Sequence, residues 1–184
     1  MTALTPRLSV VLAVKPTHRG FGWVAFEGPF APYDWGIVEK RRKRQEGSLA
    51  ALEKLIERLH PESLLLEAFE RPQWKKTGSK KKPDGTQRVS RAMVALAADR
   101  GVDVAIYTRG DVQACFASVG ARTRDEIAAA VARHVEAFRH RLPKPRKPWE
   151  SEDRRMALFS AAALVLTHYQ LGASRVFEDL KLDL

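Results

Sequence analysis

Continuous runs of apolar residues open the chain, in place of the alternation that a half-exposed strand would show. Residues 10–14 are apolar without a break and several are β-branched, which is typical of a strand buried on both faces. Lys15 ends this strand. Residues 21–27 run back as a second strand, and residues 33–38 follow the turn signal Gly28-Pro29 as a third. We therefore predict consecutive antiparallel strands, with a charged residue at the tip of the first.

Helical periodicity then alternates with two further strand patterns. Residues 48–59 and 87–100 place apolar side chains three or four positions apart, which predicts two amphipathic helices. The apolar run at 63–70 and the alternating run at 102–108 predict the fourth and fifth strands. Because a helix separates the fourth strand from the first three, we expect that strand to pair with a parallel neighbour inside the sheet.

The C-terminal third is predicted to be helical. Residues 111–118, 123–138 and 152–171 are the expected helices, and their expected capping side chains are those of Asp111, Thr123 and Ser151. Residues 142–149 form a stiff basic connector between the last two helices. We predict one domain over residues 1–172 with a basic loop insertion at 71–91, and a C-terminal appendix at 173–184.

The overall charge adds information that the apolar pattern lacks. The 184 residues carry a formal net charge of +10, and such a basic excess favours a polyanionic partner. A single cysteine excludes an internal disulfide and a cysteine-based zinc cluster. No stretch is long and apolar enough for a membrane span, and the first nine residues lack a signal-peptide pattern. We expect a cytoplasmic protein without a membrane partner.

Two charged residues follow apolar strand cores and point to a site. Lys15 ends the first strand, and Glu67 lies in the fourth strand pattern. The carboxyl ends of strands in open α/β sheets are where ligand sites are built. We therefore expect Lys15 and Glu67 to lie side by side at one edge of the sheet.

The order of elements, with charged residues at the ends of the first and fourth strands, resembles RuvC-type proteins of the ribonuclease H-like superfamily. The resemblance covers about residues 10–168. It rests on residues 13–17 followed by Gly20 and Gly22, on Leu65-Leu66-Glu67, and on Ser151-Glu152-Asp153 leading into residues 156–162. It implies an α/β fold with a mixed five-stranded sheet, three antiparallel strands and then parallel strands, flanked by helices.

The resemblance also implies a chemistry from which this sequence departs. Such nucleases hold two metal ions with clustered carboxylates and cleave phosphodiesters. Lys15 stands where they carry an acid on the first strand. Met156 or Ser160, depending on the alignment, stands where a second inward acid of the last helix is expected. An ammonium group repels a cation. We expect a degraded metal site without a cofactor, in which Lys15 pairs with Glu67 and Asp153 is a second candidate partner.

The basic segments predict where a nucleic acid binds. Phosphate contacts provide affinity without sequence choice, so we expect sequence-independent binding to structured DNA, with RNA as the less favoured partner. A further basic run covers residues 141–147. Arg124 is included because the resembled proteins carry a basic residue near phosphate there. The expected contacts are Arg41, Arg42, Lys43, Arg44, Trp74, Lys75, Lys76, Lys80, Lys81, Lys82 and Arg124.

Other interpretations stay open. Lys15 at a strand end can simply point into solvent, acids such as Glu152 and Asp153 complement a helix dipole, and basic runs are often solvated loops. An active endonuclease would need Mg²⁺ or Mn²⁺, with Glu67 and Asp153 as metal ligands and a catalytic set of Glu67, Glu70, Glu152 and Asp153. A protein-interaction scaffold is the third hypothesis. A homodimer is compatible with the sequence, which does not show one.

Overall fold

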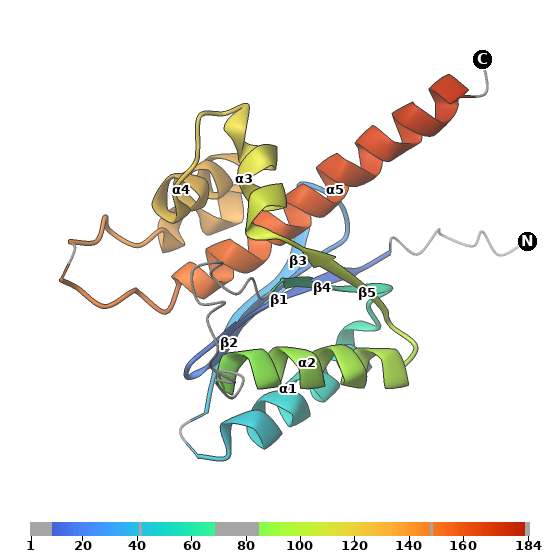
Figure 1. The fold of residues 1–184 in the computed structure, drawn as a ribbon. Helices are drawn as coiled ribbons and strands as arrows, with labels where there is room; N and C mark the ends of the chain where they lie inside the picture. Colours follow the sequence, from blue (N-terminus) through green and yellow to red (C-terminus); the bar gives the residue numbers. More distant parts are fainter. Residues whose placement is uncertain (1–8, 41, 69–84, 148, 183–184) are drawn as a thin grey trace, which may run out of the picture.

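A five-stranded mixed sheet with helices on both faces forms the body of the molecule (Figure 1). The computed structural model describes residues 9–40, 42–68, 85–147 and 149–182, and the side chains as far as residue 170. The order in the sheet is β3-β2-β1-β4-β5, antiparallel across β3, β2 and β1 and parallel across β1, β4 and β5. The strands are β1 Val11–Thr17, β2 Gly20–Phe26, β3 Pro32–Glu39, β4 Ser63–Glu67 and β5 Asp103–Tyr107. The fold class expected from the sequence is confirmed.

The strand β1 is buried on both faces, as its continuous apolar run predicts. Val11 and Ala13 pack into the core formed with α3, α4 and α5. Leu12 and Val14 pack into the other core, formed with α1 and α2. Successive side chains of a strand point to opposite faces, so a strand between two helical layers needs apolar residues at every position.

The helices form two layers, with α1 and α2 on one face and α3, α4 and α5 on the other (Figure 1). Their bounds are α1 Arg44–Leu59, α2 Gly85–Asp99, α3 Arg109–Ala117, α4 Arg124–His134, the 3₁₀ helix η2 Glu136–Arg141 and α5 Met156–Leu182. The C-terminal half of α5 projects beyond the body. No helix in the described part of the chain is long and apolar enough to span a membrane.

Two helices begin earlier than the sequence pattern predicts, because their first turns carry no apolar residue. The helix α1 begins at Arg44, after Lys43 in a left-handed conformation with φ of 45°. Arg44 also donates to the His18 carbonyl oxygen at 2.9 Å, which holds this turn against the loop after β1. The helix α2 begins at Gly85, so residues 85–91 are helical and do not belong to the predicted loop insertion.

The last helix begins later than predicted and ends later. Ser151 does not cap it, and Glu152 and Asp153 precede it. The Met156 N–H donates to the Asp153 carbonyl oxygen at 2.9 Å, and the Arg155 N–H donates to the Asp153 carboxylate at 2.8 Å. These bonds form a separate turn ahead of the helix. The helix then continues through Leu182, beyond the predicted end at residue 171.

The capping side chains of the shorter helices are also settled. Thr108 caps α3. Asp111 is the third helical residue, and its carboxylate accepts a hydrogen bond from the Thr108 N–H. Asp111 therefore completes a capping box and is not the cap that the sequence predicted. Thr123 caps α4, as the sequence predicts, and forms a capping box with Glu126. The helix α4 ends at His134, and η2 supplies the buried Phe138.

Candidate functional site

Lys15 and Glu67 form an ion pair near the edge of the sheet where β1 and β4 end. Glu67 is the last residue of β4, whereas β1 continues past Lys15 through Thr17, so Lys15 does not end its strand as the sequence predicted. The parallel register places Val11 beside Ser63 and Ala13 beside Leu65, and the same offset brings Lys15 opposite Glu67. Their side chains are only 20% and 19% exposed, on the face that packs against α5. The expected contact between the two residues is thus present. A charged group that is this far removed from water needs a partner of opposite charge. Lys15 and Glu67 are each other's partner.

Asp153, the second candidate partner of Lys15, is bonded elsewhere. Its carboxylate accepts three bonds from the Arg155 guanidinium, the shortest at 2.7 Å, and one from the Arg155 N–H at 2.8 Å. The Arg155 side-chain bond is the main reason that the pKa of Asp153 lies below its usual value. Because these bonds are local, Asp153 is held in its own turn before α5.

Glu152 is also paired with an arginine. Its carboxylate accepts from Nη1 of Arg124 at 2.6 Å, and both side chains are 43% exposed. Arg124 is the first residue of α4, so this contact joins the start of α4 to the segment before α5.

A cavity of about 540 Å³ connects these groups. Its lining includes Lys15 from β1, Glu39 from β3 and Ser160 from α5. The segment before α5 adds Ser151, Glu152, Asp153 and Arg154, and the loop after β1 adds His18 and Arg19. Glu67 lines the neighbouring pocket, together with Arg124 and Ser160. The structure therefore gathers Lys15, Glu67, Glu152, Asp153 and Ser160 around one edge of the sheet, although the three acids have three different cationic partners.

The donor set does not fit the two metal ions that the resemblance implies. Such a site needs several carboxylate oxygens free to surround each ion. Here Glu67, Glu152 and Asp153 are bonded to Lys15, Arg124 and Arg155, respectively. Within the described ranges, no group of three or more His, Cys, Asp or Glu residues is placed to hold a metal ion. Glu70, part of the alternative set, lies outside the described residues.

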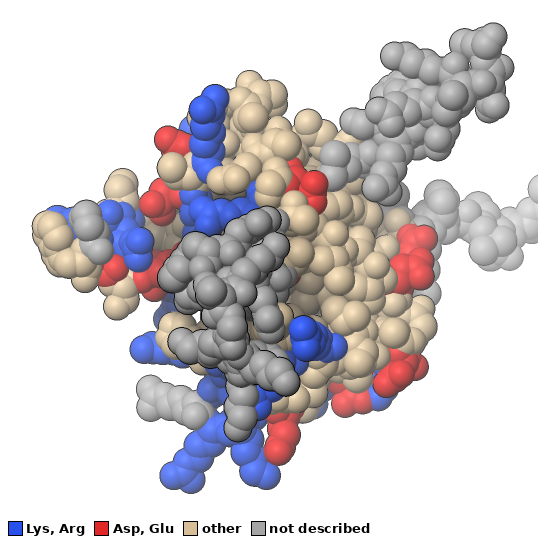
Figure 2. Space-filling model, in the orientation of Figure 1, with Lys and Arg blue, Asp and Glu red and all other residues tan. Residues whose placement is uncertain are grey.

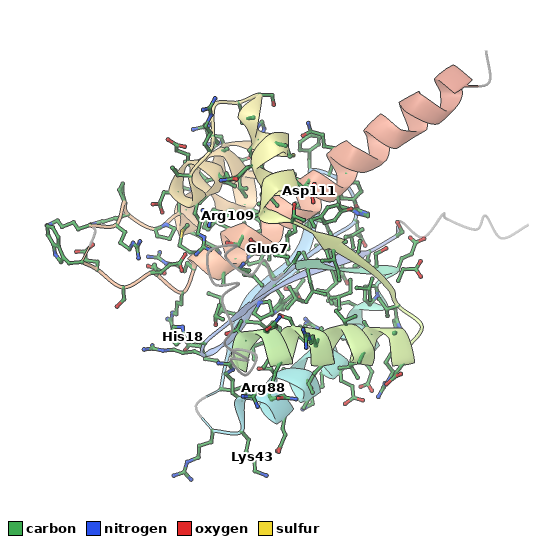
Figure 3. All side chains as sticks on the ribbon, in the orientation of Figure 1. His18, Lys43, Glu67, Arg88, Arg109 and Asp111 are labelled. Atoms are coloured by element: carbon green, nitrogen blue, oxygen red, sulfur yellow. The ribbon has the colours of Figure 1, made fainter. Side chains whose placement is uncertain are left out.

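Two further arginines face this edge and were not singled out from the sequence. Arg109 and Arg122 line a pocket together with Glu67, Arg124 and Ser160. Figure 3 shows Arg109 near Glu67, on the α5 side of the sheet. Among the described residues, Arg109 has no ion-pair partner. The signal was present in the sequence, since Arg109 follows β5 almost directly, at the same edge of the sheet as Lys15 and Glu67.

The predicted nucleic-acid contacts divide between described and undescribed segments. Arg42, Lys43 and Arg44 lie before and at the start of α1, and Lys43 is paired with Glu46 at 3.3 Å. Lys43 and His18 are found at the same lower-left end in Figure 3, and Figure 2 shows Lys and Arg gathered at the left and lower left of the molecule. Those outside the described residues are Arg41, Trp74, Lys75, Lys76, Lys80, Lys81 and Lys82.

Comparisons with solved structures agree with this architecture. A Thermus thermophilus RuvC structure matches with a TM-score of 0.60 at 22% identity, over 87% of this chain and 93% of that one. T. thermophilus RuvC in complex with a Holliday junction substrate matches with a TM-score of 0.62 at 17% identity, over 90% of this chain and 96% of that one. The yeast mitochondrial Holliday junction resolvase Ydc2 matches with a TM-score of 0.55 at 11% identity, over 98% of this chain and 89% of that one. No protein-family model and no curated protein matches the sequence. The chain has a RuvC-like, ribonuclease H-like fold.

Proposed function

On this RuvC-like fold, we propose that the protein binds DNA without sequence choice and does not cleave it by a two-metal mechanism. The observation that carries the absence of two-metal chemistry is the ion pair of Lys15 with Glu67, near the carboxyl ends of β1 and β4. The cytoplasmic location and the homodimer stay predictions.

The ion pair supports the loss of metal-dependent chemistry through its charge. In a cluster of carboxylates, mutual repulsion is relieved when a metal ion binds. Here the ammonium of Lys15 already neutralises Glu67, and a metal ion at this place would have to displace a fixed positive charge. Arg124 neutralises Glu152 in the same way, and Arg155 neutralises Asp153. The site is therefore built to be stable without a metal.

The basic groups around the same edge support binding of a polyanion. Arg109, Arg122 and Arg124 line the pocket beside Glu67, and His18 and Arg19 line the cavity beside Lys15. With a net charge of +10, the protein attracts phosphate backbones at long range. Lysine and arginine contacts to phosphate do not depend on the base, which is why we propose binding without sequence choice.

DNA binding is expected to weaken steeply as salt is added. For three phosphate contacts, counterion release predicts a loss of affinity of roughly 40-fold between 50 and 200 mM salt. Arg109→Ala is expected to weaken binding. It should also make the slope of log affinity against log salt concentration shallower by about 0.9, the value for one phosphate contact. Gel shifts or fluorescence anisotropy across a salt series measure both effects, with RNA of the same length in parallel.

Lys54→Ala is the matched control for Arg109→Ala. It removes one exposed positive charge from the middle of α1, outside the lining of the cavities at the sheet edge. The proposal predicts a smaller effect than that of Arg109→Ala. Binding that ignores salt, or no binding to DNA, would favour the protein-interaction scaffold instead.

A second expected result concerns metal and cleavage. Calorimetry is expected to show no tight uptake of Mg²⁺ by the unmodified protein, whereas Lys15→Asp restores a carboxylate next to Glu67 and is expected to introduce measurable Mg²⁺ binding. Incubation with branched and linear DNA in Mg²⁺ or Mn²⁺ is expected to leave the DNA intact. Metal-dependent cleavage that Glu67→Gln abolishes would establish the active endonuclease and sink our proposal.

A further inference from the structure

The basic connector between η2 and α5 is an arm whose two ends are held on the body of the protein. At one end, the Arg141 guanidinium lies 5.7 Å from the centre of the Trp35 ring in β3. At the other, Arg154 pairs with Glu39 at the end of β3, with 3.2 Å between Nη1 and Oε2. Residues 142–147 and 149–150 lie between these contacts, and we call the segment 142–150 the connector arm. Figure 1 shows it projecting at the left, away from the sheet.

Local hydrogen bonds order the tip of the connector arm. The Glu150 N–H donates to the Lys147 carbonyl oxygen at 3.0 Å. The Lys147 N–H donates in return to the Glu150 carboxylate at 3.0 Å. Arg146 adds a bond from Nη1 to the Glu150 carbonyl oxygen at 3.3 Å. Pro143 and Pro145 restrict the backbone on the approach to this turn.

Trp149 is carried by this turn and is open to solvent. At 78% exposed, it is the most exposed of the large hydrophobic side chains that the structure describes. Its contact is with the arm itself, since Nζ of Lys147 lies 5.6 Å from the centre of the indole ring. A tryptophan in this position does little for the stability of the core. Its large apolar face becomes favourable only when a ligand covers it.

The base of the connector arm opens onto the candidate site. Pro143, Lys144 and Arg146 line a cavity of about 360 Å³ together with Arg109 and Arg124. Three acids, Asp125, Glu152 and Asp153, line the same cavity, and two of them are paired, Glu152 with Arg124 and Asp153 with Arg155. Arg109 and Arg124 also line the pocket that contains Glu67. A phosphate backbone held by these cations would therefore run along the arm that carries Trp149.

We propose that Trp149 stacks on an unpaired base of DNA, so that the connector arm favours DNA that contains unpaired bases over continuous duplex. This inference rests on the DNA binding proposed above. The indole face accepts any base, because every base has a π-face. In a duplex both faces of a base are already stacked, so only an unpaired base is available. Lys147 adds a positive charge beside the stacked ring.

The test compares two DNAs of equal length and charge, one a perfect duplex and one with unpaired bases at its centre. Trp149→Ala is expected to weaken binding of the second DNA roughly 5- to 160-fold, the effect of losing one stacked base. Binding of the perfect duplex is expected to stay within about twofold, because the phosphate contacts are intact. Trp149→Phe should retain most of the affinity, since it keeps an aromatic face.

Phe30→Ala is the matched control, because it removes another exposed aromatic ring, 69% exposed, in the turn between β2 and β3. It is expected to bind both DNAs as the unmodified protein does. With 2-aminopurine at the unpaired position, the unmodified protein should change the fluorescence on binding and Trp149→Ala should not. Circular dichroism checks that each variant is folded.

The outcomes separate this inference from the proposed function. If Trp149→Ala binds both DNAs like the unmodified protein, the stacking role is wrong and DNA binding stands. If it loses affinity equally for both DNAs, the preference for unpaired bases is wrong. If the unmodified protein binds neither DNA, the proposed function fails, and the stacking role with it.

Discussion

Gly22→Ala is expected to lower the free energy of unfolding by about 3 kcal/mol, the upper range for forcing extra volume into a packed core. A Cβ atom at this position in β2 would lie 2.6 Å from the carbonyl carbon of Ala157 and 2.8 Å from the Leu158 nitrogen. Both are backbone atoms of α5, which cannot rotate out of the way as a side chain can. The helix would have to move, and with it the segment that carries Glu152 and Asp153. Urea denaturation followed by circular dichroism measures the loss.

Gly47→Ala is the control. It makes the same glycine-to-alanine change at a position where stability is expected to increase. Gly47 lies in the first turns of α1, and a Cβ there would meet the flexible side chain of Lys40, with Cδ at 3.0 Å. Alanine is the better helix former by up to about 1 kcal/mol, so a slight gain in stability is expected. If Gly22→Ala were as stable as the unmodified protein, the close packing of α5 on β2 would be contradicted.

Lys15→Met is expected to lower the free energy of unfolding by roughly 2 kcal/mol. Removing one partner of a buried ion pair is strongly destabilising, because the other charge is left without compensation. The Lys15 and Glu67 side chains keep about a fifth of their surface exposed, so solvent reduces the penalty left on Glu67. Denaturant unfolding at neutral pH is the measurement.

Lys15→Met combined with Glu67→Leu is expected to regain most of the stability that Lys15→Met loses. Replacing both charges by apolar groups removes the desolvation cost together with the attraction. Lys43→Met is the matched control, since its pair with Glu46 is 80% and 72% exposed, and exposed pairs contribute between about 0 and 1 kcal/mol. A double variant as unstable as the sum of its single changes would show that the two residues do not interact.

The contact between Lys15 and Glu67 was predictable because each residue follows an apolar strand core. The continuous run at residues 10–14 indicated a central strand, and the helix between the third and fourth strands indicated a parallel neighbour. In a parallel pair, both carboxyl ends lie at the same edge. The pairing of β1 with β4 then follows, and the offset in register brings these two side chains together.

The partners of Glu152 and Asp153 were not predictable in the same way. Both acids precede a long apolar helix, and the pattern placed them in its first turn. The bonds from Arg155 and Met156 to Asp153 instead form a turn ahead of the helix. The partner of Glu152 is Arg124, which lies 28 residues earlier in the chain. Local periodicity carries no information on such a contact.

The sequence by itself determined the layers of this protein, because apolar periodicity is set by which faces of a strand or helix are buried. It also indicated that the charges of Lys15 and Glu67 lie together, since each residue follows an apolar strand core. Only the tertiary structure decided which cation neutralises which acid, and that α5 needs Gly22 in order to approach β2. It also decided that the Trp149 ring is exposed at the tip of the connector arm and is not buried in the core. These features depend on distances between segments far apart in the chain, which no local pattern of residues specifies.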